Sequence, residues 1–215
     1  MSERVKIILD KNADILRLPA IALRGLVVFP GNIIHFEVGR KKSIAAIEWA
    51  MSNNNAVFLT AQQDMDVEDP GFKDLYAYGV VAEVKQVLRV SDELVKVLVE
   101  GKYRAKLLTL DSSGRFLLAS TKAAALRGTK SVDSARMEAL VRSVKEVFEE
   151  YLSLNPRLSK DVVYTIITNE DAALLCDYIP ANLLLKYTDK QALLNEGTVS
   201  GRLEKLLEIL RRETK

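Results

Sequence analysis

The stretch from Leu18 to Ser43 reads LPAIALRGLVVFPGNIIHFEVGRKKS, and it determines the fold class we expect for the first half of the chain. Residues 18–28 are mostly aliphatic and predict a strand, with Pro19 near its start, where a missing N–H is tolerated. Pro30-Gly31 predicts a tight turn that ends this strand. Apolar and polar residues then alternate over residues 34–38, which predicts a half-buried strand.

The β-rich pattern continues to about residue 120. A helix is expected over 43–51, where Ile44, Ile47, Ala50 and Met51 share one face. Further strands are predicted by apolar runs between turn signals, at residues 56–61, 79–90, 94–100, 103–110 and 115–121. Gly101-Lys102 is interpreted as a tight connection between two of them. Several short strands with one helix predict a small barrel or a folded sheet.

The second half is predicted to be helical. Ser131 is expected to cap a long helix that ends at Asn155-Pro156, and Ser159 to open a shorter one through Ile167. Asn169 is expected to cap a third helix, which Pro180 kinks or ends. The resulting class is α+β, with a β-rich domain at 1–120 and a helical domain at 121–215.

Two features near the end of the chain complete the helical prediction. Thr188 and Gln191 have the spacing of a capping box, which predicts a helix start before Leu193. The last helix, over residues 199–210, has no glycine or proline stop signal after it, so we expect it to continue beyond Lys215.

Composition excludes several classes of protein. The chain has 215 residues, of which 48% are hydrophobic and 28% charged, as in an ordinary globular protein. The net charge is only +2, which argues against a nucleic-acid binder. No signal peptide is expected in residues 1–12 and no transmembrane helix anywhere. Cys176 is the single cysteine and has no disulfide partner, which favours a reducing cytoplasm.

The residues that usually carry catalysis are few. Gly128-Thr129-Lys130-Ser131 lacks the glycine spacing of a phosphate-binding loop. His35 is expected on the polar face of a strand and Cys176 within a buried helix, so they predict no nucleophile–base pair. One histidine and one cysteine do not supply a tetrahedral metal site, and the acidic loop 64–74 lacks the spacing of a calcium loop. The basic triplet 40–42 is interpreted as a solvated helix start.

The quoted stretch resembles the opening of the Lon protease N-terminal domain. Tyr78-Gly79-Val80-Val81 and the segment from Val97 to Ala105 resemble the strands that follow in that family, and residues 191–203 resemble its helical end. The resemblance implies a β-rich, PUA-like barrel followed by a helical bundle that ends in a long helix. It also implies a fragment of a cytoplasmic, homohexameric, ATP-dependent protease, whose ATP, magnesium and serine–lysine pair act outside this chain.

The function implied by the resemblance is non-catalytic recognition of unfolded or damaged polypeptides, together with assembly of the hexamer. Two alternatives are kept: a spacer that mainly drives oligomerisation, and an RNA-binding PUA-like module. A surface that captures unfolded chains should present apolar side chains or open strand edges. The candidate substrate-binding residues are Phe29, Pro30, Phe72, Val87, Leu88 and Val90. No cofactor or metal is expected in this chain.

Overall fold

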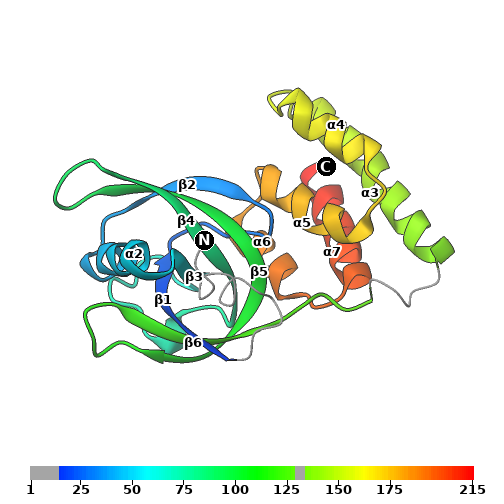
Figure 1. Ribbon diagram of the computed structural model, residues 1–215. Coiled ribbons are helices and arrows are strands. Elements are labelled where there is room, and N and C mark those ends of the chain that lie inside the picture. The colour runs from blue at the N-terminus through cyan, green and yellow to red at the C-terminus, as the bar shows by residue number, and fades with distance from the viewer. Residues whose placement is uncertain (1–14, 129–133) are drawn as a thin grey trace. The chain divides into compact units, whose positions relative to one another are not determined.

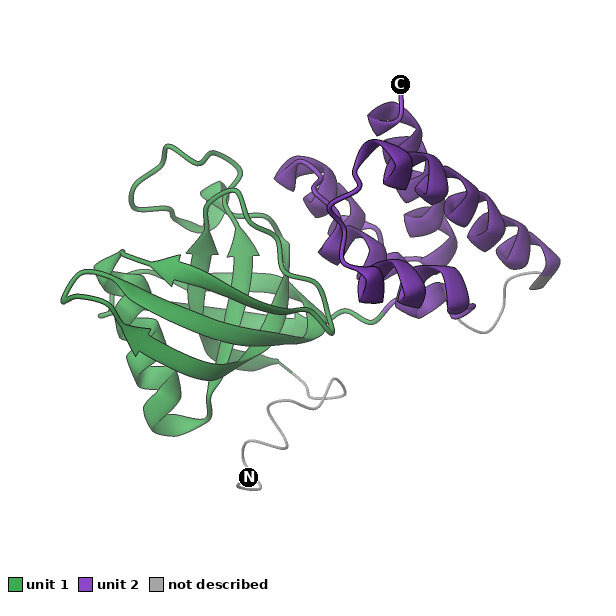
Figure 2. Cartoon of the chain, turned by 90° about the horizontal axis from the view of Figure 1, so that it is seen from above, with its two compact units in different colours: residues 1–125 green, residues 126–215 purple. Residues whose placement is uncertain are grey.

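The computed structural model describes residues 15–128 and 134–215. These residues form two compact units, 1–125 and 126–215, which Figure 2 shows in green and purple. The boundary predicted near residue 120 falls within the last strand of the first unit, β6 (Leu117–Ala123). Each unit is described by itself.

The first unit is a curved six-stranded sheet that closes on itself (Figure 1). Its other strands are β1 (Leu16–Leu23), β2 (Ile33–Val38), β3 (Ala56–Ala61), β4 (Tyr78–Arg89) and β5 (Val95–Asp111). The strand order is β2-β5-β4-β3-β1-β6, and β6 also pairs with β5, so five strands form a ring to which β2 is added. Among the strand pairs that the structure describes, β1–β3 is parallel and the others are antiparallel.

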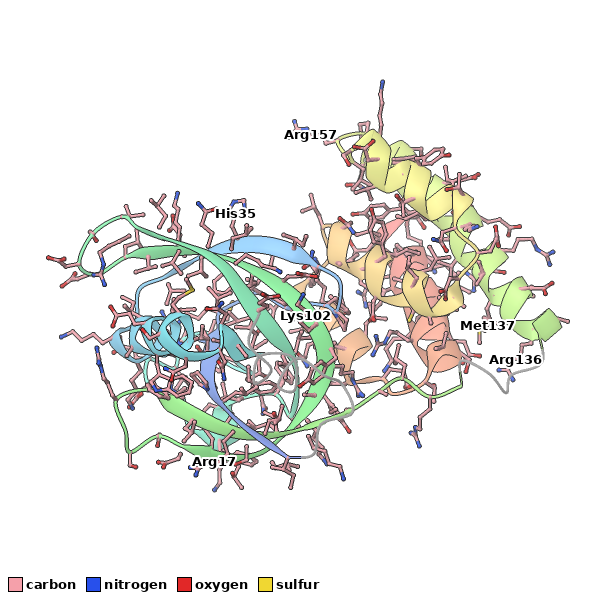
Figure 3. The ribbon with its side chains drawn as sticks, in the orientation of Figure 1. Arg17, His35, Lys102, Arg136, Met137 and Arg157 are labelled. Atoms are coloured by element: carbon pink, nitrogen blue, oxygen red, sulfur yellow. The ribbon has the colours of Figure 1, made fainter. Side chains whose placement is uncertain are left out.

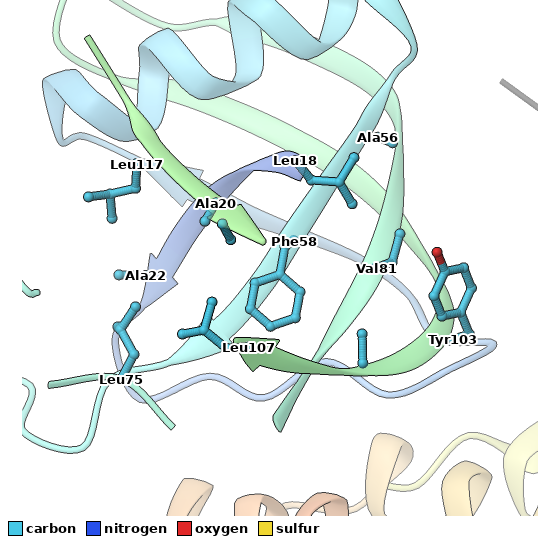
Figure 4. Packing of buried hydrophobic residues seen from close by; sticks show 12 residues of the cluster. Leu18, Ala20, Ala22, Ala56, Phe58, Leu75, Val81, Tyr103, Leu107 and Leu117 are labelled. Carbon is cyan, nitrogen blue, oxygen red and sulfur yellow. The ribbon is translucent and has the colours of Figure 1, made fainter. Parts of the chain in front are cut away.

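The interior of the ring is filled by aliphatic and aromatic side chains, which come from every strand of the ring (Figure 4). Phe58 on β3 is fully buried at the centre of this cluster, and Leu18, Val81 and Leu107 pack around it. The helix α2 (Lys41–Asn53) packs against β1, β3, β4 and β6. Its buried face includes Ile44, Ile47 and Ala50, which confirms the helix and the buried face predicted for it, except for Met51, which is 43% exposed.

Strand β5 is continuous through Gly101, so the prediction of a tight connection at Gly101-Lys102 was wrong. This position in the strand requires glycine, because the Phe29 carbonyl oxygen lies only 2.2 Å from where a Cβ would be. Gly101 donates its N–H to the Asn32 carbonyl and accepts the Gly31 N–H, at 2.9 and 2.8 Å. The predicted turn before β2 is confirmed: Asn32 N–H bonds the Phe29 carbonyl, and Gly31 has a φ of 76°.

The second unit contains five helices within the described part of the chain. They are α3 (Ser134–Leu154), α4 (Lys160–Thr168), α5 (Ala172–Asn182), α6 (Tyr187–Asn195) and α7 (Val199–Glu213). The last helix packs against α3, α5 and α6, with Leu203, Leu206 and Leu210 fully buried. The α+β class predicted from the sequence, a β-rich domain followed by helices, is confirmed.

The helix starts were predicted with mixed success. Ser159 caps α4 as expected, since its hydroxyl accepts the Val162 N–H. Asp171, rather than Asn169, caps α5, because its carboxylate accepts two N–H groups of the first turn, while Asn169 ends α4. Thr188 lies inside α6 and forms no capping box. The predicted cap Ser131 lies outside the described residues.

Candidate polypeptide-binding surface

Three strand segments form an extension of the barrel that we call the arm: residues 83–89 of β4, residues 95–100 of β5, and β2. Because side chains alternate along a strand, the arm has two faces. Val95, Val97 and Val99 lie on its inner face and are at most 2% exposed, as the alternation predicted. The outer face carries the side chains of the opposite phase.

The outer face presents an apolar stripe, formed by Ile33, Leu98 and Leu88. Ile33 is 64% exposed and Leu88 59% exposed, while Leu98 is half-buried. Leu98 is directly opposite His35, and Lys96 is directly opposite Leu88, so Leu98 is the diagonal neighbour of both Ile33 and Leu88. The stripe therefore runs obliquely across all three strands.

Four charged side chains flank the stripe and join β4 to β5. Glu83 and Glu100 lie directly opposite each other on β4 and β5, which by itself is a repulsive pairing. Two β-bulges bring in Lys85 and Lys102, one from each strand. Each lysine contacts both carboxylates, at N–O distances of 2.7 to 3.0 Å. Figure 3 labels Lys102 on β5.

These contacts shift the acid–base equilibria of the cluster. Burial by itself raises the pKa of Glu83, but hydrogen bonds from Lys85 and Lys102 outweigh burial and leave that pKa below its ordinary value. Hydrogen bonds from Lys102 and Lys85 likewise lower the pKa of Glu100. Hydrogen bonds to Glu100 and Glu83 raise the pKa of Lys85. Each of these three shifts favours the charged form, so Glu83, Glu100 and Lys85 stay charged at neutral pH and the cluster joins the two strands.

The structure separates the six residues predicted as substrate contacts. Leu88 is on the outer face of the arm, and Val90, 52% exposed, lies at the turn that joins β4 to β5. Val87 is half-buried and faces the opposite side from Leu88, because the two are neighbours in one strand. The predicted ridge of Val87, Leu88 and Val90 is thus divided between two faces.

The remaining predicted contacts come from loops. Phe29 is 0% exposed, so its ring does not lie on the surface as the prediction of a substrate contact expected; glycine at position 101 lets the Phe29 backbone approach β5 closely. Pro30 is half-buried beside it. Phe72 is 48% exposed in the short 3-10 helix η1 (Phe72–Asp74). The sequence reasoning missed Ile33, whose only signal is an isoleucine in the polar phase of the β2 alternation.

The basic triplet has a mainly structural role. Arg40 donates to the carbonyls of Ala22 and Val67, at 3.1 and 3.4 Å, and to the side chain of Gln62. It thereby holds the loop after β3 to the end of β1. Lys42 pairs with Asp69 at 3.0 Å. Two of the three cations are therefore already partnered within the fold.

The two residues considered for catalysis are found in unrelated surroundings. His35 is exposed on β2 and points away from the sheet (Figure 3). Cys176 is fully buried in α5 of the other unit, and burial raises the pKa of its thiol to about 12. A thiol with that pKa is an inert thiol at neutral pH.

The second unit has an apolar hollow that the sequence did not reveal. Its volume is about 570 Å³, and it lies between the end of α3, the start of α4 and the end of α5. Tyr151, Leu154, Val162 and Leu184 contribute to its wall. Leu184 is 83% exposed and Leu154 59% exposed, so this unit also offers apolar surface.

Two other features are absent from the part of the chain that the structure describes. Within residues 15–128 and 134–215, no group of three or more His, Cys, Asp or Glu side chains is placed to hold a metal ion. Over the same ranges, none of the helices combines the length and the apolarity needed to cross a membrane.

Comparison with known proteins identifies relatives along nearly the whole chain. Residues 17–212 match the family model of the ATP-dependent protease La (LON) substrate-binding domain. The chain is 38% identical over 202 residues to the Lon protease of Desulforamulus reducens and 36% identical over 203 residues to that of Escherichia coli (strain K12). These matches cover 94% of this chain but only 25% and 26% of the relatives, so the chain spans about a quarter of their length.

Solved structures of low sequence identity share the fold. The N-terminal domain of the Mycobacterium avium complex Lon protease superposes with a TM-score of 0.72 at 20% identity, over 91% of this chain and 98% of that one. A Lon N-terminal domain protein from Xanthomonas campestris gives a TM-score of 0.63 at 15% identity, over 90% and 98% of the two chains. From its sequence match over residues 17–212, supported by this shared fold, the chain belongs to the family of ATP-dependent protease La (LON) substrate-binding domains.

Proposed function

We propose that this chain is a non-catalytic recognition module that binds unfolded or damaged polypeptides through the outer face of the arm. The single observation that carries this proposal is the exposed stripe of Ile33, Leu98 and Leu88, in a chain that belongs to a substrate-binding family. Folded proteins bury most of their large apolar side chains, whereas unfolded polypeptides expose them. An exposed apolar stripe therefore selects for unfolded polypeptides as partners.

The arm supports this role through its rigidity. The charged cluster of Glu83, Lys85, Glu100 and Lys102 fixes β4 to β5 immediately beside the stripe. A surface that is already ordered loses little conformational entropy when a chain binds. One stripe of this size binds weakly, and several copies in one assembly would raise the overall affinity through avidity.

The finer expectations for the whole protein are part of the same proposal. We propose that the complete protein is a cytoplasmic, homohexameric, ATP- and magnesium-dependent endopeptidase, and that this module delivers substrates to it. The balanced charge of the chain, +2 overall, argues against RNA as a partner.

Replacing Leu88 by serine tests the proposal. Full burial of a leucine side chain contributes about 1.5–3 kcal/mol. Leu88 is 59% exposed before binding, so its burial by a partner contributes about 1–2 kcal/mol, or roughly a 5- to 30-fold change in Kd. Fluorescence anisotropy with a labelled, permanently unfolded protein, such as reduced and alkylated lactalbumin, measures this change.

A matched control is Leu184→Ser, which removes an even more exposed leucine from the second unit. We expect Leu184→Ser to leave the affinity within about twofold of the wild type. Equal affinities for Leu88→Ser and the wild type would contradict binding at the outer face. A wild-type chain that does not bind the unfolded protein would contradict the recognition role itself.

A further inference from the structure

Strand β2 is the end strand of the sheet and pairs on one side only. Within the described residues its sole partner strand is β5, from Ile33 opposite Glu100 to Val38 opposite Val95. A strand edge of this kind presents unpaired N–H and C=O groups in the spacing that another extended chain requires.

The hydrogen-bonding phase shows which backbone groups face the free edge. The Gly101 N–H donates to the Asn32 carbonyl and the Gly101 carbonyl accepts from Gly31, so both backbone groups of Gly101 face the side of β5 on which β2 lies. The residues that face one neighbouring strand alternate along a ladder, so Val99, Val97 and Val95 bond to residues 34, 36 and 38, their partners on β2. Ile33, His35 and Glu37 therefore direct three donors and three acceptors away from β5. None of these six groups has a hydrogen bond elsewhere in the described part of the chain.

The free edge of β2 lacks the features that usually block strand addition. The arm has a second open edge, at residues 85–89 of β4, and that edge carries a bulge at Lys85 and a second cation at Arg89. Arg89 is also bonded to Glu48 of α2, at 2.7 Å. Strand β2, by contrast, contains no proline, no bulge and no lysine, and its one carboxylate, Glu37, pairs with Lys96 of β5 at 3.5 Å. Charged side chains and bulges protect edges against added strands, so β4 is protected and β2 is receptive.

The space beside β2 suits the side chains of an added strand. A hollow of about 600 Å³ lies beside the last three residues of β2, Phe36, Glu37 and Val38. Its wall also includes Leu23 at the end of β1, Leu26 in the loop that follows, and the polar side chains of Arg24, Arg40 and Ser43. Side chains of an added strand that share the face of Phe36 would enter it.

From these observations we infer that β2 accepts an extended segment of an unfolded polypeptide as an additional strand, bonded to the backbone of Ile33, His35 and Glu37. This inference rests on the proposed function and specifies its substrate class: segments of about six residues, the length of β2, with apolar side chains at alternate positions. Backbone bonding tolerates many sequences, and every second side chain of an added strand would lie beside Ile34 and Phe36, whose aliphatic and aromatic groups favour apolar neighbours. Proline-containing segments are excluded because they lack the N–H groups that the edge requires.

His35→Pro tests the inference in the 215-residue chain. The His35 N–H points away from β5, so proline removes a donor from the free edge and none from the ladder. The matched control, His35→Ala, removes the same side chain but keeps the N–H. The probe is a fluorescent peptide of alternating valine and threonine, compared with the same peptide carrying two prolines.

We expect His35→Pro to bind the valine–threonine peptide about 2- to 10-fold more weakly than His35→Ala, the range for one backbone hydrogen bond, because both variants lose the imidazole and only proline loses the N–H. The proline peptide should not bind the wild type. Hydrogen exchange on the wild-type chain gives a second measurement if His35→Pro fails to fold. Bound peptide should slow exchange at Ile33, His35 and Glu37 by at least about tenfold, with little change at Ile34 and Phe36.

The outcomes separate this inference from the proposed function. Strand addition would be overturned if Leu88→Ser lost binding while His35→Pro bound as well as His35→Ala, and if bound peptide left hydrogen exchange at Ile33, His35 and Glu37 unchanged. The outer-face proposal would then still stand. Equal binding of the proline and the valine–threonine peptides would also overturn strand addition. A wild-type chain that binds neither the peptide nor an unfolded protein would overturn both proposals.

Discussion

The buried Arg202–Asp177 pair is expected to dominate the stability of the helical unit. The Arg202 side chain is 0% exposed and its guanidinium donates to Asp177 on α5. It also donates to the carbonyls of Leu194 and Glu196, at 3.4 and 2.8 Å, so one side chain joins α5, the end of α6 and α7. Arg202→Ala would leave the Asp177 carboxylate, which is only 16% exposed, without its cation.

The magnitude follows from this burial. Breaking a buried ion pair from one side costs about 3–5 kcal/mol, and the partial exposure of Asp177 favours the lower value, about 3 kcal/mol. For a unit of roughly 90 residues, each kcal/mol lowers Tm by about 4–8 °C, so Arg202→Ala should lower it by roughly 12–24 °C. Differential scanning calorimetry measures this shift.

The control is Arg212→Ala, which removes an arginine of the same helix that is 54% exposed and paired with Asp189. An exposed pair contributes about 0–1 kcal/mol, so the Tm of this variant should stay within about 8 °C of the wild type. A Tm for Arg202→Ala no lower than that of Arg212→Ala would refute the reasoning. Replacing Arg202 and Asp177 together by Met and Leu should restore most of the lost stability, because no uncompensated charge remains.

Three further predictions concern other parts of the chain. The folded-state pKa of Glu83 is lowered, so its charge stabilises the barrel above its unfolded pKa, about 4.3. This contribution is lost as the pH falls through the folded-state pKa. In urea titrations, the loss of stability caused by Glu83→Gln should therefore be largest at neutral pH and shrink below about pH 4. Gly101→Ala should destabilise the barrel by about 1–3 kcal/mol, because the new methyl group meets the Phe29 carbonyl. Gly114→Ala is the control, since its methyl group makes only ordinary contacts and should not destabilise the barrel. Equal urea midpoints for the two variants would contradict this account of β5. The thiol of Cys176 should resist a thiol-specific reagent in the native chain and react at once in denaturant, and rapid reaction in buffer alone would show that α5 opens readily.

The parts of the fold that the sequence predicted are those with a regular period. The alternation of Val95, Val97 and Val99 identified the inner face of the arm, and the turn at Pro30-Gly31 was identified by its residue types. The continuity of β5 was not predictable, because a glycine at a turn and a glycine that admits a neighbouring backbone look alike in sequence. That distinction depends on the Phe29 carbonyl, 72 residues away in the chain.

The predicted substrate contacts stay predictions, and the structure shows which of them are exposed. Leu88 and Val90 are exposed near the polar turn that ends β4. Phe29 was misplaced, because its burial depends on the same close approach to Gly101. Ile33 was missed because a single apolar residue in a polar phase carries little signal until the strand beside it is known. The free edge of β2 follows from the order of the strands in the sheet, and no local sequence pattern encodes that order.

The central claim, that the outer face of the arm contacts unfolded polypeptides, is tested most directly by photo-crosslinking. A photoreactive benzoylphenylalanine is placed in the full chain in place of Leu88 and, in a separate variant, in place of Leu184, since both side chains are well exposed. Irradiation in the presence of a labelled unfolded protein should give adducts from position 88 well above those from position 184. Equal yields, or a greater yield from position 184, would contradict the assignment of this surface.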